Sequence, residues 1–148
     1  MKSVLQKTKY LQRPNGHKIA YQVIEGKGPA ILFLCGYGAN MQGVKANMLK
    51  QMARKHGMKL ICFDHFGHGK STGKMKHASI SQWINDTKAL MRHLGEKEYI
   101  MVGSSVGAWI GLNVAKQDPT RIKSFIGIAT AFDATEKIAK PMIASNDT

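Results

Sequence analysis

The sequence is poor in cysteine and has no long apolar run. It contains two cysteines in 148 residues. Cys35 and Cys62 each stand at the end of an apolar segment, which favours two reduced, partly buried thiols over a disulfide. No apolar run approaches the roughly 20 residues needed to cross a membrane, and the lysine-rich N-terminus lacks the apolar segment of a secretory signal. These absences predict a cytoplasmic protein without a membrane span.

Acidic side chains are also scarce. Nine Asp and Glu residues oppose 22 Lys and Arg residues, which gives a net charge of +13. Such a charge attracts anionic ligands. However, the lysines are spread through nearly every segment instead of forming one block with aromatic residues, which favours a solvated surface and no nucleic-acid partner. With 43% hydrophobic residues, no internal repeat and no linker, we expect one globular domain over residues 1–148.

A Gly-x-Ser-x-Gly sequence occupies residues 103–107. A strand that turns directly into a helix forces the central residue into a strained backbone conformation, so Gly103 and Gly107 remove side chains that would clash there. The turn exposes the Ser105 hydroxyl. It also points the first N–H groups of the helix at the reacting centre, where they can stabilise an oxyanion.

The surroundings of this motif support a chemical role for Ser105. Five matching residues are weak evidence by themselves. Residues 98–102 are typical of a short buried strand, and a helical pattern runs from Val106 until Asp118-Pro119 ends it. This is the strand, turn and helix order that the motif requires, so Ser105 is the candidate nucleophile.

The rest of the sequence alternates strands with helices. Apolar segments typical of buried strands lie at 30–34, 59–63 and 123–129, and helical patterns lie at 42–56 and 79–94. Near the N-terminus, segments 9–12 and 17–24 flank the turn-forming Arg13-Pro14-Asn15-Gly16 and predict a hairpin. The alternation predicts an α/β fold with a mainly parallel sheet, covered on both faces and entered through an antiparallel hairpin. Ligands bind such sheets where the loops gather at the carboxyl ends of the strands.

Four segments in the same order resemble the α/β-hydrolase fold family of serine hydrolases, over about residues 18–136. They are the glycine-rich loop 35–46, the loop 63–73, the turn around Ser105 and the segment 126–131. The similarity is to a subgroup of small bacterial hydrolases and the mitochondrial acyl-protein thioesterase and acyl-glucuronide esterase of animals. It implies a small-molecule ester or thioester substrate, an acyl-serine intermediate, and no cofactor or metal.

The resemblance also implies roles for particular residues. Ser105 is the nucleophile, and the main-chain N–H groups of Tyr37 and Val106 form the oxyanion hole. Many members have histidine where Cys35 stands, but the donors of the hole are main-chain groups. The family takes its acid after a seventh strand and its histidine after an eighth, and this sequence ends after the part that matches the sixth. We therefore expect an incomplete, N-terminal portion of the domain, in which Asp133, after the sixth strand, is a candidate acid by analogy with a few distant members.

The missing base leaves an alternative open. All six histidines precede Ser105 in the sequence. The histidines in the loop 64–73, here called the Asp64 loop, are expected to be solvated. Asp64 itself is expected to accept hydrogen bonds from nearby backbone N–H groups. Because a serine hydroxyl is a poor nucleophile without a base, the alternative is a catalytically inert remnant or half of a split hydrolase. The partner of a split hydrolase would be a complementing C-terminal fragment or another copy of the chain. A third hypothesis is a scaffold that kept only the fold, and such a protein would not need Ser105.

Two further motifs are not favoured. Gly69-Lys70-Ser71 resembles the end of a phosphate-binding P-loop, but the spacing puts Asp64 where the first glycine belongs, and its carboxylate would repel phosphate. His65 and His68 lack the neighbouring acids or thiols that would complete a metal site.

Overall fold

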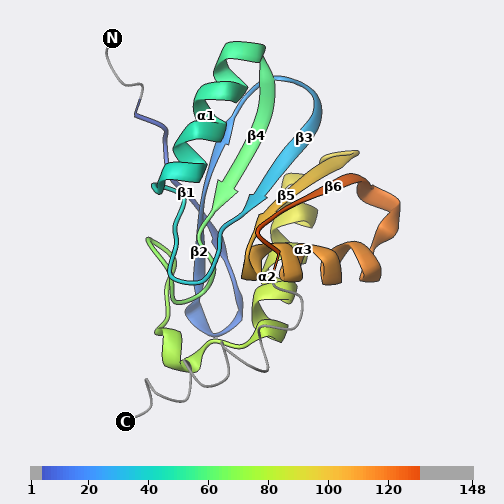
Figure 1. Ribbon diagram of the computed structural model, residues 1–148. Helices are drawn as coiled ribbons and strands as arrows, with labels where there is room; N and C mark the ends of the chain where they lie inside the picture. Colours follow the sequence, from blue (N-terminus) through green and yellow to red (C-terminus); the bar gives the residue numbers. More distant parts are fainter. Residues whose placement is uncertain (1–4, 131–148) are drawn as a thin grey trace.

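The chain forms one mixed sheet with helices on both faces (Figure 1), and the computed structural model describes residues 5–130. The strands in this range are β1 (Lys9–Gln12), β2 (Lys18–Ile24), β3 (Lys27–Leu34), β4 (Met58–Phe63), β5 (Tyr99–Ser104) and β6 (Ile122–Ile128). The α-helices are α1 (Val44–His56), α2 (Ile80–Leu94) and α3 (Val106–Gln117). Short 3-10 helices lie at η1 (Pro14–Gly16), η2 (Met75–His77) and η3 (Pro119–Arg121).

The order of strands across the sheet is β1-β2-β4-β3-β5-β6. β4, β3, β5 and β6 are parallel to one another, whereas β1 pairs with β2, and β2 with β4, in the antiparallel sense. The predicted hairpin is confirmed, and its turn contains Asn15 at φ 64°, a conformation that Asn tolerates better than most residues. The predicted mainly parallel sheet is confirmed as well.

β3 begins earlier than the sequence pattern predicts. The expected break at 25–29 is reduced to the turn Glu25-Gly26, because Lys27 already pairs with the start of β4. A Cβ atom on Gly26 would lie 2.2 Å from the carbonyl carbon of Met58. The close approach of two backbones therefore explains the glycine that the sequence pattern suggested as a break.

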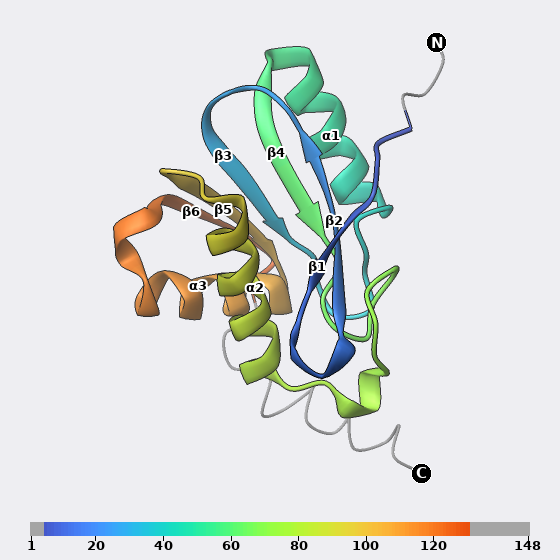
Figure 2. The same cartoon turned by 180° about the vertical axis from the view of Figure 1, so that it is seen from behind.

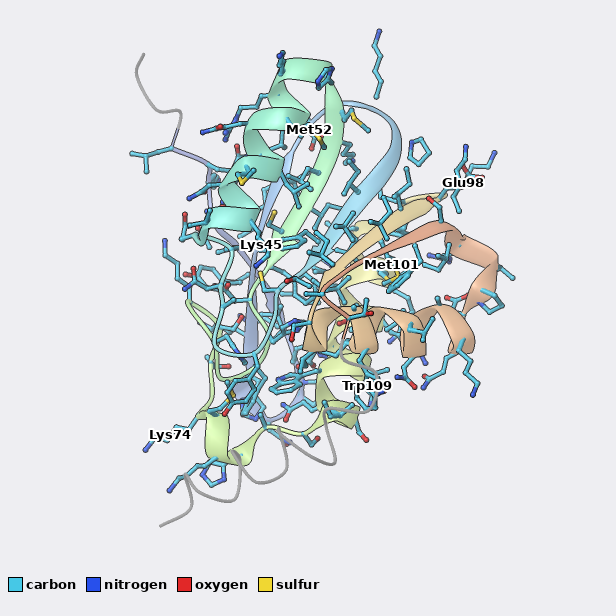
Figure 3. The ribbon with its side chains drawn as sticks, viewed as in Figure 1. Lys45, Met52, Lys74, Glu98, Met101 and Trp109 are labelled. Carbon is cyan, nitrogen blue, oxygen red and sulfur yellow. The ribbon has the colours of Figure 1, made fainter. Side chains whose placement is uncertain are left out.

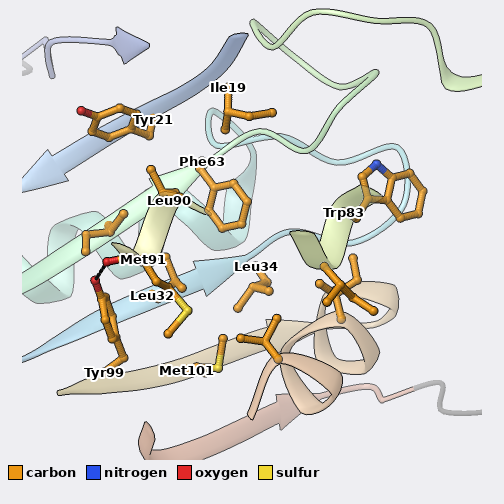
Figure 4. Close-up of a cluster of buried hydrophobic side chains, with 14 of the residues drawn as sticks. Ile19, Tyr21, Leu32, Leu34, Phe63, Trp83, Leu90, Met91, Tyr99 and Met101 are labelled. Atoms are coloured by element: carbon orange, nitrogen blue, oxygen red, sulfur yellow. Dashed lines mark hydrogen bonds between the residues drawn. The ribbon is translucent and has the colours of Figure 1, made fainter. Parts of the chain in front are cut away.

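The core lies on both faces of the sheet because side chains alternate along β3. Leu32 and Leu34 pack on the side of α2 and α3, and Ile31 and Phe33 on the side of α1. Figure 2 shows α2 and α3 on the face away from α1. Figure 4 shows the cluster on that face, where the Tyr99 hydroxyl donates to the Met91 carbonyl at 2.8 Å. A sheet covered on both faces explains why its strands read as continuous apolar segments.

The two cysteines are free thiols, as predicted, and they are fully rather than partly buried. Burial raises the pKa of both Cys35 and Cys62 to about 12, so both stay protonated at neutral pH. Separately, no helix among residues 5–130 is both long and apolar enough to cross a membrane.

Candidate active site

Ser105 stands at a sharp turn between β5 and α3. Its backbone has φ 54° and ψ −119°, a positive φ that is uncommon for a residue other than glycine and costs about 1–3 kcal/mol. The main-chain N–H of Ser105 donates to the Ile128 carbonyl at 2.9 Å, which holds the turn against the end of β6. The predicted order of strand, turn and helix around Ser105 is therefore present.

The glycines on either side of Ser105 stand where no side chain fits. A Cβ atom on Gly103 would lie 2.4 Å from the Ala108 Cα atom. A Cβ atom on Gly107 would lie 2.2 Å from the Leu34 carbonyl oxygen and 2.5 Å from that of Cys35. These close approaches place the first turn of α3 against the end of β3. The loop that follows β3 therefore also lies near this turn.

That loop, residues 35–43 and here called the β3–α1 loop, lies beside Ser105. A Cβ atom on Gly36 would be 3.2 Å from the Ser104 carbonyl oxygen and 3.5 Å from the Ser105 Cβ atom. Turns and loops of residues 5–130 form backbone hydrogen bonds in addition to those within helices and strands. The N–H groups of Tyr37 and Val106 donate none of these additional bonds. Neither N–H group is therefore occupied by a turn or loop hydrogen bond to the backbone.

The β3–α1 loop, the first turn of α1 and the Ser105 turn enclose a cleft of about 250 Å³. Ser105 is half-buried at this cleft. Lys45, labelled in Figure 3 near the start of α1, contributes a positive charge to its lining. The remaining lining residues are mainly small or uncharged, and include Tyr37, Ala39, Asn40, Val44 and Ala46. The cleft is therefore lined by a half-buried serine and by Tyr37 of the β3–α1 loop.

Asp64 has the structural role that the sequence suggests. It is buried, and its Oδ1 accepts from the Met41 N–H at 2.8 Å while its Oδ2 accepts from the Lys70 N–H at 2.9 Å. A Cβ atom on Gly69 would lie 2.2 Å from Asp64 Oδ2, so the glycine leaves room for the carboxylate. One carboxylate thus joins the β3–α1 loop to the loop after β4.

The expectation that the histidines of the Asp64 loop are solvated is wrong. His65 and His68 are 2% and 5% exposed, because Asp64 draws the loop inward and both rings pack near the indole of Trp83. His65 Nε2 donates to the Cys35 carbonyl at 3.0 Å, and the Gly38 N–H donates to His68 Nε2 at 2.9 Å. Burial lowers the pKa of His65 to about 3 and also lowers the pKa of His68, so both imidazoles are neutral.

Lys50 is a buried residue that the sequence analysis missed, and it binds the β3–α1 loop at Met41. Its ammonium group is buried and donates to the Met41 carbonyl at 2.6 Å and to Gln22 Oε1 at 2.7 Å. Burial lowers the pKa of Lys50. The available signal was its spacing, since Ala46, Lys50 and Ala53 share the buried face of α1. Lys50 and Asp64 together hold the two main-chain polar groups of Met41.

The structure does not supply Ser105 with a base from residues 5–130. None of the side-chain hydrogen bonds in this range involves Ser105, and the lone pair of His68 Nε2 is used by Gly38. Asp133, the candidate acid, lies outside the described residues. In the described part of the chain, no group of three His, Cys, Asp or Glu side chains is arranged to bind a metal ion.

The strand order, the helices on both faces and the serine at a strand-to-helix turn define an α/β-hydrolase fold. Residues 27–146 match the family described as serine aminopeptidase, S33, and the chain belongs to this family of α/β hydrolases.

Individual relatives agree with this assignment. The chain is similar to the mitochondrial palmitoyl-protein thioesterase ABHD10 of Rattus norvegicus, with 37% identity over 84% of this chain and 42% of the relative. Among solved structures it is similar to mouse α/β-hydrolase domain-containing protein 10, with a TM-score of 0.82 and 32% identity over 95% of this chain and 57% of that one. A putative hydrolase from Agrobacterium vitis gives a TM-score of 0.82 and 29% identity over 93% and 57%. The chain thus spans about two fifths of the curated relative.

Proposed function

We propose that this chain carries the nucleophile and the oxyanion hole of a serine hydrolase that cleaves a carboxylic ester or thioester. The observation that carries the proposal is the backbone of Ser105, held at φ 54° in a cleft beside the β3–α1 loop. A strained turn that presents a hydroxyl to a cleft has a chemical purpose that a simple connection between β5 and α3 would not need. The thioesterase relatives support the substrate class.

The proposed reaction begins when Ser105 Oγ attacks the acyl carbon as a base removes the hydroxyl proton. The carbonyl oxygen becomes an oxyanion, which the N–H groups of Tyr37 and Val106 stabilise. Collapse of the tetrahedral intermediate expels the alcohol or thiol, which takes up a proton, and leaves an acyl-serine. Water then attacks the acyl-serine, releases the carboxylic acid and restores the Ser105 hydroxyl.

The proposal requires a base and an acid from outside residues 5–130. A separate polypeptide or a second copy of the chain fits both roles, whereas the part of the chain that includes Asp133 fits only the role of the acid, because all six histidines precede Ser105. β6 offers a place for such a partner, because it pairs only with β5 among the described strands and Ile126 on it is 52% exposed. A partner that adds a strand there would reach the end of the sheet where Ser105 lies.

A fluorophosphonate probe tests the proposal without knowledge of the substrate, because it reacts with an activated serine. We expect labelling, of the chain alone or of the chain with a complementing segment, that disappears in Ser105→Ala and persists in Ser124→Ala, a matched change at an exposed serine on β6. Equal labelling of the wild type and Ser105→Ala would contradict the role of Ser105.

The alternative, an inert remnant or half of a split hydrolase, is favoured by the lack of a described hydrogen bond from Ser105 to any base. Coexpression with a C-terminal segment of the mouse relative tests it. Labelling of Ser105 only in the presence of that segment would identify a split half. A folded chain that stays unlabelled with and without the segment would identify an inert remnant.

A further inference from the structure

Two buried imidazoles bind the β3–α1 loop on either side of one peptide group. His65 Nε2 donates to the Cys35 carbonyl oxygen at 3.0 Å, which belongs to the peptide between residues 35 and 36. His68 Nε2 accepts from the Gly38 N–H at 2.9 Å, which belongs to the peptide between residues 37 and 38. The peptide between these two carries the N–H of Tyr37.

Each hydrogen bond limits the rotation of a planar peptide group, because the carbonyl or N–H vector turns with the whole plane. With the peptides on both sides held, the middle peptide can turn only through a coupled change of ψ at Gly36 and φ at Tyr37. Gly36 lies against Ser105, since a Cβ atom built on it would be 3.5 Å from the Ser105 Cβ atom. The peptide between the two held ones is therefore the one beside the serine.

The hydrogen-bond partners determine the tautomer of each ring. His68 Nδ1 lies 3.2 Å from the Phe66 carbonyl, which can only accept, so Nδ1 carries the proton and the Nε2 lone pair receives the Gly38 N–H. His65 has the opposite tautomer, because its Nε2 must donate to the Cys35 carbonyl. Both rings are ordered by packing, with ring centroids 5.9 Å apart and His68 5.6 Å from Trp83.

We propose that His68, together with His65, is a positioning residue that directs the Tyr37 N–H toward the oxyanion formed at Ser105. This role rests on the proposed function. It differs from that of a general base, because the lone pair of His68 Nε2 is occupied by Gly38 and the ring is buried. The histidines of the Asp64 loop thus act on the reaction through the backbone of the β3–α1 loop.

Two substitutions of His68 separate the hydrogen bond from the volume of the ring. His68→Phe keeps an aromatic ring but offers no acceptor to Gly38, whereas His68→Gln places an amide oxygen near the position of Nε2. The quantity to measure is the fluorophosphonate labelling rate of folded protein, in whichever form labels, the chain alone or the chain with a complementing segment. We expect His68→Phe to label about 10- to 100-fold more slowly than the wild type, and His68→Gln to stay within a few-fold of it.

A loss of stability alone must not produce the same result. Tyr99→Phe removes the hydrogen bond to the Met91 carbonyl at the opposite end of β5 from Ser105, so it should lower the melting temperature and leave the labelling rate unchanged. Wild-type labelling of His68→Phe, or equal slowing of Tyr99→Phe, would overturn the positioning role while Ser105 remained the nucleophile. A wild type that never labels would instead overturn the proposed function and, with it, this role.

A measurement on the wild type covers the case in which His68→Phe does not fold. The ¹⁵N–¹H spectrum of the imidazole rings reports which nitrogen carries the proton. We expect an unprotonated Nε2 at His68 and a protonated Nε2 at His65. A proton on Nε2 of His68 would exclude the bond from Gly38 and overturn the proposal.

Discussion

At the scale of single residues, the space around two glycines of α3 differs sharply. A Cβ atom on Gly107 would meet the Leu34 carbonyl oxygen at 2.2 Å, which is backbone and cannot move aside cheaply. A Cβ atom on Gly111 would meet first the edge of the Phe125 ring at 3.0 Å, which is side chain. We expect Gly107→Ala to lower the free energy of unfolding by at least about 2 kcal/mol.

Gly111→Ala is the matched control for Gly107→Ala, because it makes the same change one turn further along the same helix. Its gain in helix propensity, up to about 1 kcal/mol, opposes the small shift required of Phe125, so stability should stay within about 1 kcal/mol of the wild type. Urea denaturation of both variants measures these differences. Equal midpoints for the two would show that the contact between α3 and β3 is looser than the structure indicates.

At the scale of elements, α1 is joined to β2 and to the β3–α1 loop by the buried side chain of Lys50. Lys50→Met removes the donor to the Met41 carbonyl and to Gln22 Oε1 and leaves both oxygens buried without it. We expect a loss of about 1 to 3 kcal/mol, the usual cost of an unsatisfied buried acceptor, offset in part by no longer burying an ammonium group. Lys55→Met, on the exposed face of the same helix, should change stability by less than about 0.5 kcal/mol.

Chemical denaturation with each lysine variant measures the difference directly. A Lys50→Met protein at least as stable as the wild type would mean that the desolvation of the ammonium group outweighs its two hydrogen bonds. Hydrogen exchange at the Met41 amide adds a local measurement. In Lys50→Met the Met41 carbonyl loses its donor, so the hydrogen bond from the Met41 N–H to Asp64 should open more readily and the amide should exchange faster.

The elements themselves could be predicted because each has a local signal. The hairpin and the apolar strands follow from spacing and turn residues, and the Ser105 turn follows from its motif. The burial of Lys50 has a local signal in its helical spacing with Ala46 and Ala53, but the burial of His65 and His68 could not be predicted in this way. It depends on contacts between loops that are distant in the sequence, such as that between Gly38 and His68, for which no local pattern exists.

At the scale of the whole molecule, the +13 charge leaves few ion pairs to hold the fold together. Among the described residues, Arg13 and Asp86 form the bridge with the more buried carboxylate, while the bridge between Lys123 and Glu98 is long and exposed. Exposed pairs contribute little to stability. The two-sided apolar core and the buried polar contacts of the loops after β3 and β4 therefore carry most of the stability.

Acid should weaken this protein before its ordinary carboxylates titrate. The pKa of His65 is about 3 in the folded chain and 6.5 when exposed to water; burial is the main cause, and neighbouring His68 adds to it. A histidine with a lowered pKa contributes full stability above about pH 6.5 and loses it as the pH falls toward 3, because the unfolded chain binds the proton first. Between pH 6.5 and pH 4.5 the loss of stability from His65 is roughly 2 kcal/mol. His68 adds to the loss in the same direction, since its pKa is also lowered, whereas the raised pKa of buried Asp86 opposes it.

Urea midpoints measured across this pH range should fall steadily in the wild type and less steeply in His65→Gln, which cannot titrate. A midpoint that stays level from pH 7 to 5 would show that the imidazole of His65 is not kept from water as the structure places it.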